Sequence, residues 1–301
     1  MILSNQQLNQ LSELALNAVT LAGKYINQFD RTQLTTEFKN SGSSRSSQVV
    51  TEVDLHCQDI IITQLQASCE LFDIALLSEE NCAEIAINEH PRLDKAYFWC
   101  IDPLDGTLPF IEGREGYAVS VALVNKQGQS QLSAIYLPAT HDYFHTLFNE
   151  QAKRVVFRNN KPFMNNQADH HNLNFYCDQS FLSNKAYPRL IEKLNKLLIA
   201  FNLQQLNVTS EHGAVVNALL VLENSPAIYI KLPKPQEGGG ALWDYSGTSC
   251  IAEAVEAWVS DIHGLPLALN QADSYYMNKK GVIYASNEKL AKAVIDLCQA
   301  L

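Results

Sequence analysis

Two carboxylates follow one apolar stretch of this chain, and their spacing raises the question of what compensates their charge. In WCIDPLDGTLPF, Asp102 and Asp105 stand three residues apart directly after the apolar run and just before a glycine. A second apolar run, IALLS, leads into Glu79 and Glu80. If both runs form neighbouring strands, the carboxylates converge at one sheet edge, where mutual repulsion would raise their pKa values. Hard oxygen ligands at such spacing suit Mg²⁺ or Mn²⁺, so we interpret the pattern as a candidate metal site.

The same residues have simpler explanations, which the motif by itself leaves open. Asp, Pro and Gly are favoured turn residues, so D-P-L-D-G-T is also typical of an ordinary turn. The spacing does not fit an EF-hand loop, and the chain contains no GxxxxGK phosphate loop. Gly106 would let the backbone approach a ligand, and N–H groups at a following helix start would suit an anion. Asp244 opens an apparent helix much later in the chain, where it is either a helix cap or a further carboxylate of the same site.

The composition excludes several classes of function. The chain has 301 residues, 47% of them hydrophobic, and a net charge of −10, which fits two domains of ordinary size. No basic stripe with interleaved aromatic residues appears, which disfavours binding to a nucleic-acid polymer. No apolar stretch approaches the roughly 20 residues of a membrane helix, and the N-terminus lacks the features of a signal peptide. The seven cysteines show no C-x-x-C spacing, so we expect a cytoplasmic protein with reduced thiols.

The elements that must position the candidate residues follow from the periodicity of the sequence. Apolar residues at helical spacing predict a helix over residues 5–28, and a second helix begins near Asp54. Further on, apolar runs joined by short turns predict an antiparallel-rich sheet, and after it strands and helices alternate as in α/β proteins. We therefore expect an α+β domain over residues 1–150 with most of the site, and an α/β domain over residues 151–301 that contributes Asp244.

Taken together, these motifs resemble the signatures of the inositol monophosphatase family of metal-dependent, lithium-sensitive phosphatases. The first signature, D-P-[hydrophobic]-D-G-T-x-x-F, is matched from Asp102 to Phe110, and V-S-[hydrophobic]-A-L follows at residues 119–123. The second, W-D-x-x-[small]-x-x-x-[apolar]-x-E-A, is matched from Trp243 to Ala254. VVTEVD resembles the family's V-T-x-x-D, and DIHGLPLALN resembles its closing D-x-x-G-x-P-L segment. The motifs stand in family order over most of the chain, which makes the resemblance specific.

The resemblance implies a fold, a cofactor and a set of metal ligands. The fold would be a layered αβαβα sandwich with an antiparallel sheet in the N-terminal half and a mixed sheet in the C-terminal half, assembled as a homodimer. Two or three Mg²⁺ ions, which Mn²⁺ can replace, would activate water for attack on a phosphate monoester. By resemblance, Glu79, Asp102 and the carbonyl group of Leu104 would bind the first ion. Asp102, Asp105 and Asp244 would bind the second.

The resemblance also implies roles in catalysis and in substrate binding. Thr107 would hydrogen-bond the attacking water with Asp54 as its partner, and Glu79 would complete the catalytic set. The N–H groups of Gly106 and Thr107 would hold the phosphate beside Asp105. Further substrate contacts would come from positions scattered along the chain, namely Lys39, His212, Gly213, Lys231 and Glu237.

The motifs leave the identity of the substrate open. Glu237 stands seven residues before Asp244, where inositol monophosphatases have an acid that contacts ring hydroxyls. The loop KLPKPQEGGGAL is longer than in that subfamily, and its Lys231 or Lys234 would instead suit a second phosphate. LLSEE leans towards the bisphosphate nucleotidases, whereas GYAVSVAL is closer to the inositol branch.

We therefore expect a Mg²⁺-dependent phosphomonoesterase that acts on a small phosphorylated metabolite. A 3'(2'),5'-bisphosphate nucleotide is slightly favoured as the substrate, and inositol 1-phosphate is the alternative. A catalytically inactive scaffold that binds metal or a phosphorylated ligand is the alternative from another class. A mechanism through an aspartyl-phosphate is disfavoured, because it would want D-x-D near the start of the chain.

Overall fold

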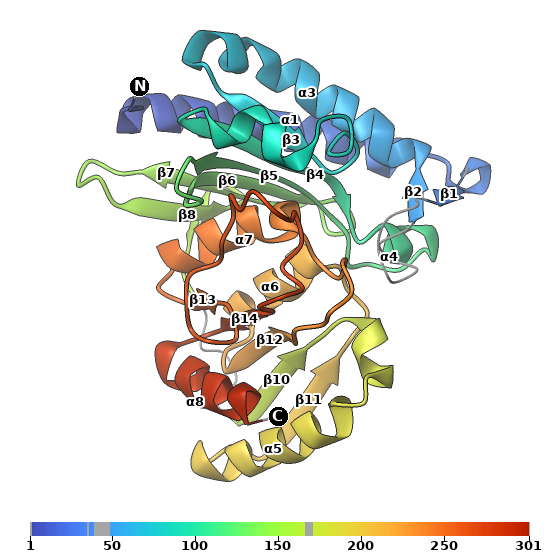
Figure 1. The fold of residues 1–301 in the computed structure, drawn as a ribbon, viewed down its shortest axis with the longest axis vertical. Coiled ribbons are helices and arrows are strands. Elements are labelled where there is room, and N and C mark those ends of the chain that lie inside the picture. The colour runs from blue at the N-terminus through green and yellow to red at the C-terminus, as the bar shows by residue number, and fades with distance from the viewer. Residues whose placement is uncertain (1, 35, 39–48, 166–170, 301) are drawn as a thin grey trace.

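Two sheets and the helices around them form five layers, which confirms the expected αβαβα architecture (Figure 1). The computed structural model describes residues 2–34, 36–38, 49–165 and 171–300. From the top of Figure 1 the layers are a helix pair, a seven-stranded sheet, a second helix pair, a five-stranded sheet and a third helix pair. The three pairs are α1 (Asn5–Gln28) with α3 (Glu52–Phe72), α6 (Ala214–Glu223) with α7 (Leu242–Ala254), and α5 (Tyr187–Ala200) with α8 (Glu288–Gln299).

The outer helix α1 begins where the sequence predicts, at a capping box. Gln7 N donates to the Ser4 hydroxyl, and Ser4 N donates to the Gln7 side chain at 2.9 Å, so two N–H groups of the helix end are satisfied. The buried face of α1 packs on the seven-stranded sheet together with α3, around a core that includes Trp99. At Gly23 the helix comes so close to Tyr136 of β6 that no side chain fits between them.

The seven-stranded sheet is antiparallel except at one edge. Its strand order is β3-β4-β5-β6-β7-β8-β9, and only the β3–β4 pair is parallel. Two parallel neighbours end at the same edge of a sheet. The segment that follows β3 therefore lies beside the C-terminal end of β4. The strands are β3 (Ala75–Ser78), β4 (Tyr97–Asp105), β5 (Ala118–Asn125), β6 (Ser130–Leu137), β7 (Asp142–Phe148), β8 (Arg154–Arg158) and β9 (Lys161–Phe163).

The five-stranded sheet is mixed, as the alternation of strands and helices in the second half predicts. Its order is β11-β10-β12-β14-β13, with β10 parallel to both β11 and β12. The two pairs that involve β14 are antiparallel. The strands are β10 (Asn172–Tyr176), β11 (Gln205–Thr209), β12 (Ala227–Lys231), β13 (Trp258–Ser260) and β14 (Val282–Ala285).

The two halves share a core, which bears on the expected domain division. Helices α6 and α7, from the second half, pack between the sheets, and β8 and β9 extend the first sheet beyond residue 150. The division at residue 150 therefore stays a prediction.

Short elements surround the end of β4. They are the paired strands β1 (Thr36–Phe38) and β2 (Val49–Thr51), and the single-turn helix α4 (Thr107–Ile111). Residues 39–48, with Lys39, lie outside the described residues.

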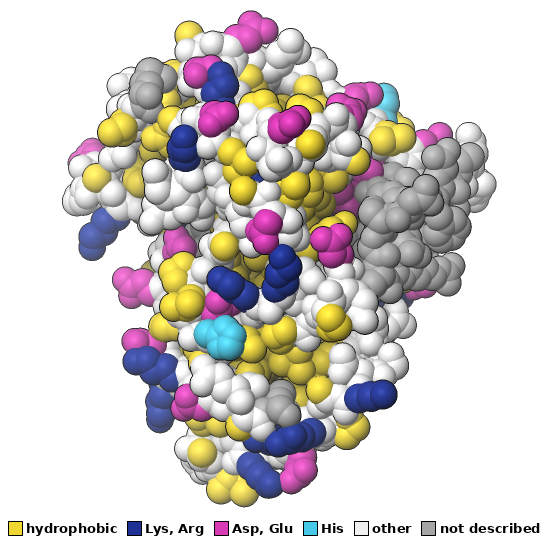
Figure 2. Space-filling model, in the orientation of Figure 1, with side chains coloured by type: hydrophobic (Ala, Val, Ile, Leu, Met, Phe, Trp, Pro, Cys, Tyr) yellow, Lys and Arg dark blue, Asp and Glu magenta, His cyan; other side chains and the backbone are white. Residues whose placement is uncertain are grey.

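Two features of the described residues concern charge and membrane-spanning helices. On the face drawn in Figure 2, basic and acidic side chains of the described residues are interspersed. Among the residues that the structure describes, no helix combines the length and apolar character that a membrane span requires.

The contact between α1 and the sheet yields a test of the packing. A Cβ atom at Gly23 would lie 2.1 Å from Cδ1 of Tyr136, so Gly23→Val should lower the free energy of unfolding by about 1–3 kcal/mol. Urea denaturation measures this change. Lys24→Ala, at the exposed neighbouring position, should unfold at the wild-type urea concentration. A Gly23→Val variant that unfolds with it would contradict the close contact.

Candidate active site

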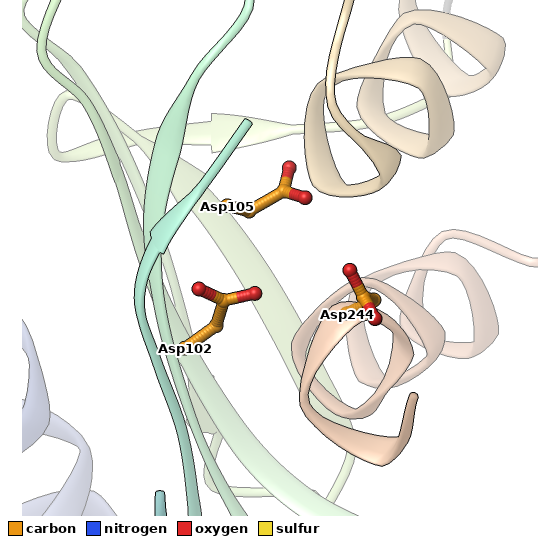
Figure 3. Close-up of side chains that lie close together, drawn as sticks. All are labelled: Asp102, Asp105 and Asp244. Atoms are coloured by element: carbon orange, nitrogen blue, oxygen red, sulfur yellow. The ribbon is translucent and has the colours of Figure 1, made fainter. Parts of the chain in front are cut away.

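Three aspartates face one another between the end of β4 and the start of α7 (Figure 3). Asp102, Asp105 and Asp244 each contribute one carboxylate oxygen, and these oxygens all lie within 4.8 Å of one another. Asp102 and Asp105 are buried, and Asp244 is half-buried in the first turn of α7. The structure thus brings together carboxylates from the two halves of the chain.

An irregularity in β4 lets two of these aspartates reach the same cleft. Side chains alternate along a strand, so residues three apart normally point to opposite faces of the sheet. The pairing of β4 with β5 shifts register between Asp102 and Asp105, and Leu104 N turns back to donate to Asp102 Oδ1 at 3.1 Å. The D-x-x-D spacing therefore works only because the strand is irregular at this point.

Asp105 is held by the N-terminus of α6. Ala214 N donates to its Oδ1 at 3.1 Å, and Val215 N donates to its Oδ2 at 2.8 Å. A Cβ atom at Gly213 would lie 2.4 Å from that same Oδ2, so only glycine allows this approach. The helix dipole and the two donors favour the charged form of the carboxylate.

The carboxylate of Asp102 is only half satisfied, which is the strongest sign of a bound cation. Its Oδ2 is buried and has no hydrogen-bond partner among the described residues. Glu79 lines the same cleft, because its N–H donates to Ile101 O at 3.1 Å and fixes it beside the end of β4. The donors are all hard oxygens, so the residues present fit Mg²⁺ or Mn²⁺.

Burial and mutual repulsion destabilise the charged forms of the three aspartates, which favours binding of protons or cations. Burial, with help from Glu79 and Asp105, raises the pKa of Asp102 well above its usual range. Burial and Asp244 do the same for the pKa of Asp105. Burial raises the pKa of Asp244 to about 6, although Lys231 opposes the shift. Protons or cations must compensate this concentration of charge.

Thr107 and Asp54 form a second, adjoining arrangement. The Thr107 hydroxyl lies 3.0 Å from Asp54 Oδ1 and 3.1 Å from Leu104 O. Asp54 Oδ2 accepts hydrogen bonds from the N–H and the hydroxyl of Thr51 at 2.8 and 2.6 Å. One carboxylate therefore caps helix α3 with one oxygen and holds Thr107 with the other. Burial raises the pKa of Asp54 to about 6.

Gly106 forms the turn between β4 and α4. Its φ of +79° is in the left-handed region, and a Cβ atom there would lie 2.6 Å from Gly116 O. Both constraints favour glycine, so the backbone leaves the strand sharply just before Thr107.

The cluster lies in a cleft of about 850 Å³ that extends from the carboxylates towards the C-terminal half. His212, Gly213 and Lys231 line it, whereas Glu237 is exposed and is not among the described lining residues. Lys231 Nζ lies 3.0 Å from Asp178 Oδ2, and although burial opposes its charge, Asp178 raises the pKa of Lys231. Burial lowers the pKa of His212.

Sequence reasoning missed four charged residues that line the cleft, Asp178, Arg114, Glu112 and Glu211. Asp178 closely follows β10, and residues beyond the carboxyl ends of parallel strands commonly form ligand crevices, so this signal was available. Arg114 lies in the turns after α4, where its guanidinium bonds to Glu112 and, at 2.8 Å, to Glu211 O. No local pattern marks it.

Comparisons with known proteins agree with this geometry. The sequence model of the inositol monophosphatase family matches residues 7–301. The 3'(2'),5'-bisphosphate nucleotidase CysQ of Haemophilus influenzae is 28% identical over 275 residues, which cover 88% of this chain and 90% of that protein. The Nus factor SuhB of Salmonella typhimurium is 31% identical over 131 residues, 44% of this chain and 45% of that protein. The structure of an inositol monophosphatase from Anabaena superposes with a TM-score of 0.70 at 16% identity, covering 98% and 97% of the two chains.

The raised pKa values predict how metal-free protein responds to pH. An acid with a raised pKa keeps its proton to higher pH in the folded state than in the unfolded state. The destabilisation that it causes is therefore absent below about pH 4, grows as the pH rises towards the folded pKa, and is complete above that pKa. Asp102→Asn should therefore stabilise the metal-free protein, by on the order of 1–3 kcal/mol at pH 7.5 and by less at pH 5. Thermal unfolding in a chelator measures the difference.

The difference in stability between Asp102→Asn and the wild type cancels the effect of groups that make both proteins more stable as pH rises. Burial lowers the pKa of His90 to about 4, which makes both proteins more stable as pH rises. Added Mg²⁺ should raise the melting temperature of the wild type at pH 7.5 and have less effect on Asp102→Asn. A variant that is less stable than the wild type at pH 7.5 without metal would contradict the repulsion argument.

Proposed function

The chain belongs to the inositol monophosphatase family and is a phosphoric monoester hydrolase, and we propose that it hydrolyses a small phosphorylated metabolite with Mg²⁺ held by the carboxylates of β4, α7 and the loop after β3. The single observation that carries the metal dependence is the buried Oδ2 of Asp102, which has no protein partner and belongs to the three-aspartate cluster. Mn²⁺ is a plausible substitute because it takes the same oxygen ligands.

The proposed ligand set is the one that the family resemblance implies, and the cluster of Asp102, Asp105 and Asp244 supports it. Glu79, Asp102 and the carbonyl group of Leu104 would hold one ion, and Asp102, Asp105 and Asp244 would hold another. When bound, such ions lower the pKa of a water and compensate charge on the phosphate oxygens. The exposed side of the cluster opens into the cleft, where a third ion would also have room.

Thr107 and Asp54 would orient the attacking water. Because the Thr107 hydroxyl donates a hydrogen bond to Asp54 Oδ1, its lone pairs can accept a hydrogen bond from a water on the cleft side. Asp54 is in turn fixed by Thr51, so the hydroxyl is held in one orientation. The geometry supplies a positioned acceptor beside the metal ligands.

The turn after β4 would hold the phosphate group. Gly106 and Thr107 line the cleft, and their backbone N–H groups would bind the phosphate there. Asp105 lies beside this turn, so a phosphate there would lie close to the metal ligands. Such a placement would align phosphorus with the water held by Thr107.

The part of the cleft beyond the metal ligands favours a nucleotide with a second phosphate. Lys231 and Arg114 line this part, where each cation is paired with one carboxylate, Asp178 and Glu112, and can also attract an anionic substrate. Glu237, the acid that would contact inositol hydroxyls, is exposed outside the described lining. The similarity to CysQ points the same way. We propose a 3'(2'),5'-bisphosphate nucleotide as the substrate, with inositol 1-phosphate as the second candidate.

The surroundings of the thiols support a reducing compartment. None of the seven cysteines forms a disulfide, and five of them are buried. We propose a cytoplasmic location on this ground. The homodimer, the lithium sensitivity and the contact of Lys39 stay predictions of the family resemblance.

The water-orienting role predicts a strong effect of a single hydroxyl. Thr107→Val should reduce kcat by about 100- to 10,000-fold with little change in KM. The substitution removes the hydroxyl that accepts a hydrogen bond from the water, and it leaves the metal ligands in place. Thr107→Ser keeps the hydroxyl and should retain activity within about tenfold. Steady-state phosphate release measures both variants. Equal activity of the valine and serine variants would exclude the hydroxyl from the mechanism.

The choice of substrate is tested by a direct comparison. With saturating Mg²⁺, kcat/KM for adenosine 3',5'-bisphosphate should exceed that for inositol 1-phosphate by at least about tenfold, because Lys231 and Arg114 can attract a second phosphate, which inositol 1-phosphate lacks. A ratio below one would favour the inositol branch. If folded protein with Mg²⁺ released phosphate from neither compound nor from a panel of sugar phosphates, the non-catalytic scaffold would replace this proposal.

A further inference from the structure

The proposed metal site draws its ligands from segments that lie far apart in the chain. Contacts between these segments must therefore fix the distance between the ligands. Glu79 follows β3 in the first half, and Asp244 lies in the first turn of α7 in the second half. Tyr275 touches the supports of both. Its carbonyl group accepts from Leu242 N at 2.9 Å, and its hydroxyl donates to Cys82 O at 3.2 Å.

These two contacts lie close to the two ligands along the chain. Leu242 is the first residue of α7, two positions before Asp244, and Cys82 is three positions after Glu79 in the turns that line the cleft. A single tyrosine thus ties the start of the helix to the loop that carries the glutamate. The next residue, Tyr276, forms a β-bridge with Ala241, which holds the chain against the same helix start.

The ring of Tyr275 is itself held from both sides. Arg92, in the short 3-10 helix Pro91–Leu93, is fully buried with its guanidinium carbon 5.3 Å from the ring centre. Arg92 Nη2 donates to Gln271 O at 2.8 Å, and Nη1 bonds to the side chain of Asn270. The Trp243 ring lies 5.6 Å from the Tyr275 ring, centre to centre. These contacts therefore restrict the position of the Tyr275 ring and of its hydroxyl.

We propose that Tyr275, backed by Arg92, is a positioning residue that sets the distance between the Glu79 and Asp244 sides of the metal site. The proposal rests on the metal-dependent function proposed above. Tyr275 bonds to Cys82 O, so it acts through the loop that carries Glu79. Groups that orient metal ligands from outside commonly change metal affinity when they are altered.

Tyr275→Phe is the sharpest test, because it keeps the ring contacts and deletes only the hydroxyl that bonds to Cys82 O. We expect the affinity for Mn²⁺, measured as free ion by electron paramagnetic resonance, to fall about three- to tenfold. At saturating Mg²⁺ kcat should stay within about twofold, and the melting temperature in a chelator should be nearly unchanged. Tyr97→Phe is the matched control: it removes a hydroxyl that accepts from Leu3 N at 3.3 Å, at the far end of β4, and should bind Mn²⁺ like the wild type.

A double variant separates positioning from a general loss of stability. If the hydroxyl acts through the Glu79 loop, Tyr275→Phe should cause no further loss of Mn²⁺ affinity in a Glu79→Gln background. Additive losses, or wild-type affinity in Tyr275→Phe, would overturn the inference and leave the proposed function standing. A wild-type protein that binds no Mn²⁺ would instead overturn both.

Discussion

The need to keep several carboxylates together in a poorly hydrated cleft is the constraint on which the rest of this structure depends. Three helices present their N-termini to that charge: Asp54 lies in the first turn of α3, Asp244 in the first turn of α7, and Asp105 accepts from the first N–H groups of α6. The positive ends of three helix dipoles therefore converge on one site and offset part of the repulsion. The layered architecture makes this possible, because α3 and the pair α6 and α7 lie on opposite faces of the same sheet.

The site lies between the two halves of the molecule, so its residues come from a regular strand pair, an irregular strand end and a helix start. The parallel pairing of β3 with β4 brings Glu79 beside the end of β4, and the register shift within β4 aims two aspartates at one point. The second half then closes the arrangement with α7. Neither half has the complete set of proposed ligands, so the site depends on the packing of α6 and α7 between the sheets.

The sequence predicted the layers and the carboxylate cluster better than it predicted the substrate side of the cleft. Periodicity located α1, and the acidic ends of two apolar runs indicated one shared edge, because these signals are local. The register shift between Asp102 and Asp105 depends on the partner strand β5, so no local pattern could reveal it. The pairing of Lys231 with Asp178 and the outward position of Glu237 depend on how distant loops fold, and counting residues back from Asp244 could not find them.

The carboxylate of Asp54 links the proposed water-orienting hydroxyl of Thr107 to one helix end. Because the same group caps α3 and holds the Thr107 hydroxyl, the first turn of α3 cannot fray without releasing that hydroxyl. Helix ends open with far less energy than whole domains. With the role proposed above for Thr107, opening of this turn on warming would abolish activity before the protein unfolds, and selection for heat-resistant activity would act first on this turn rather than on the cores between the layers.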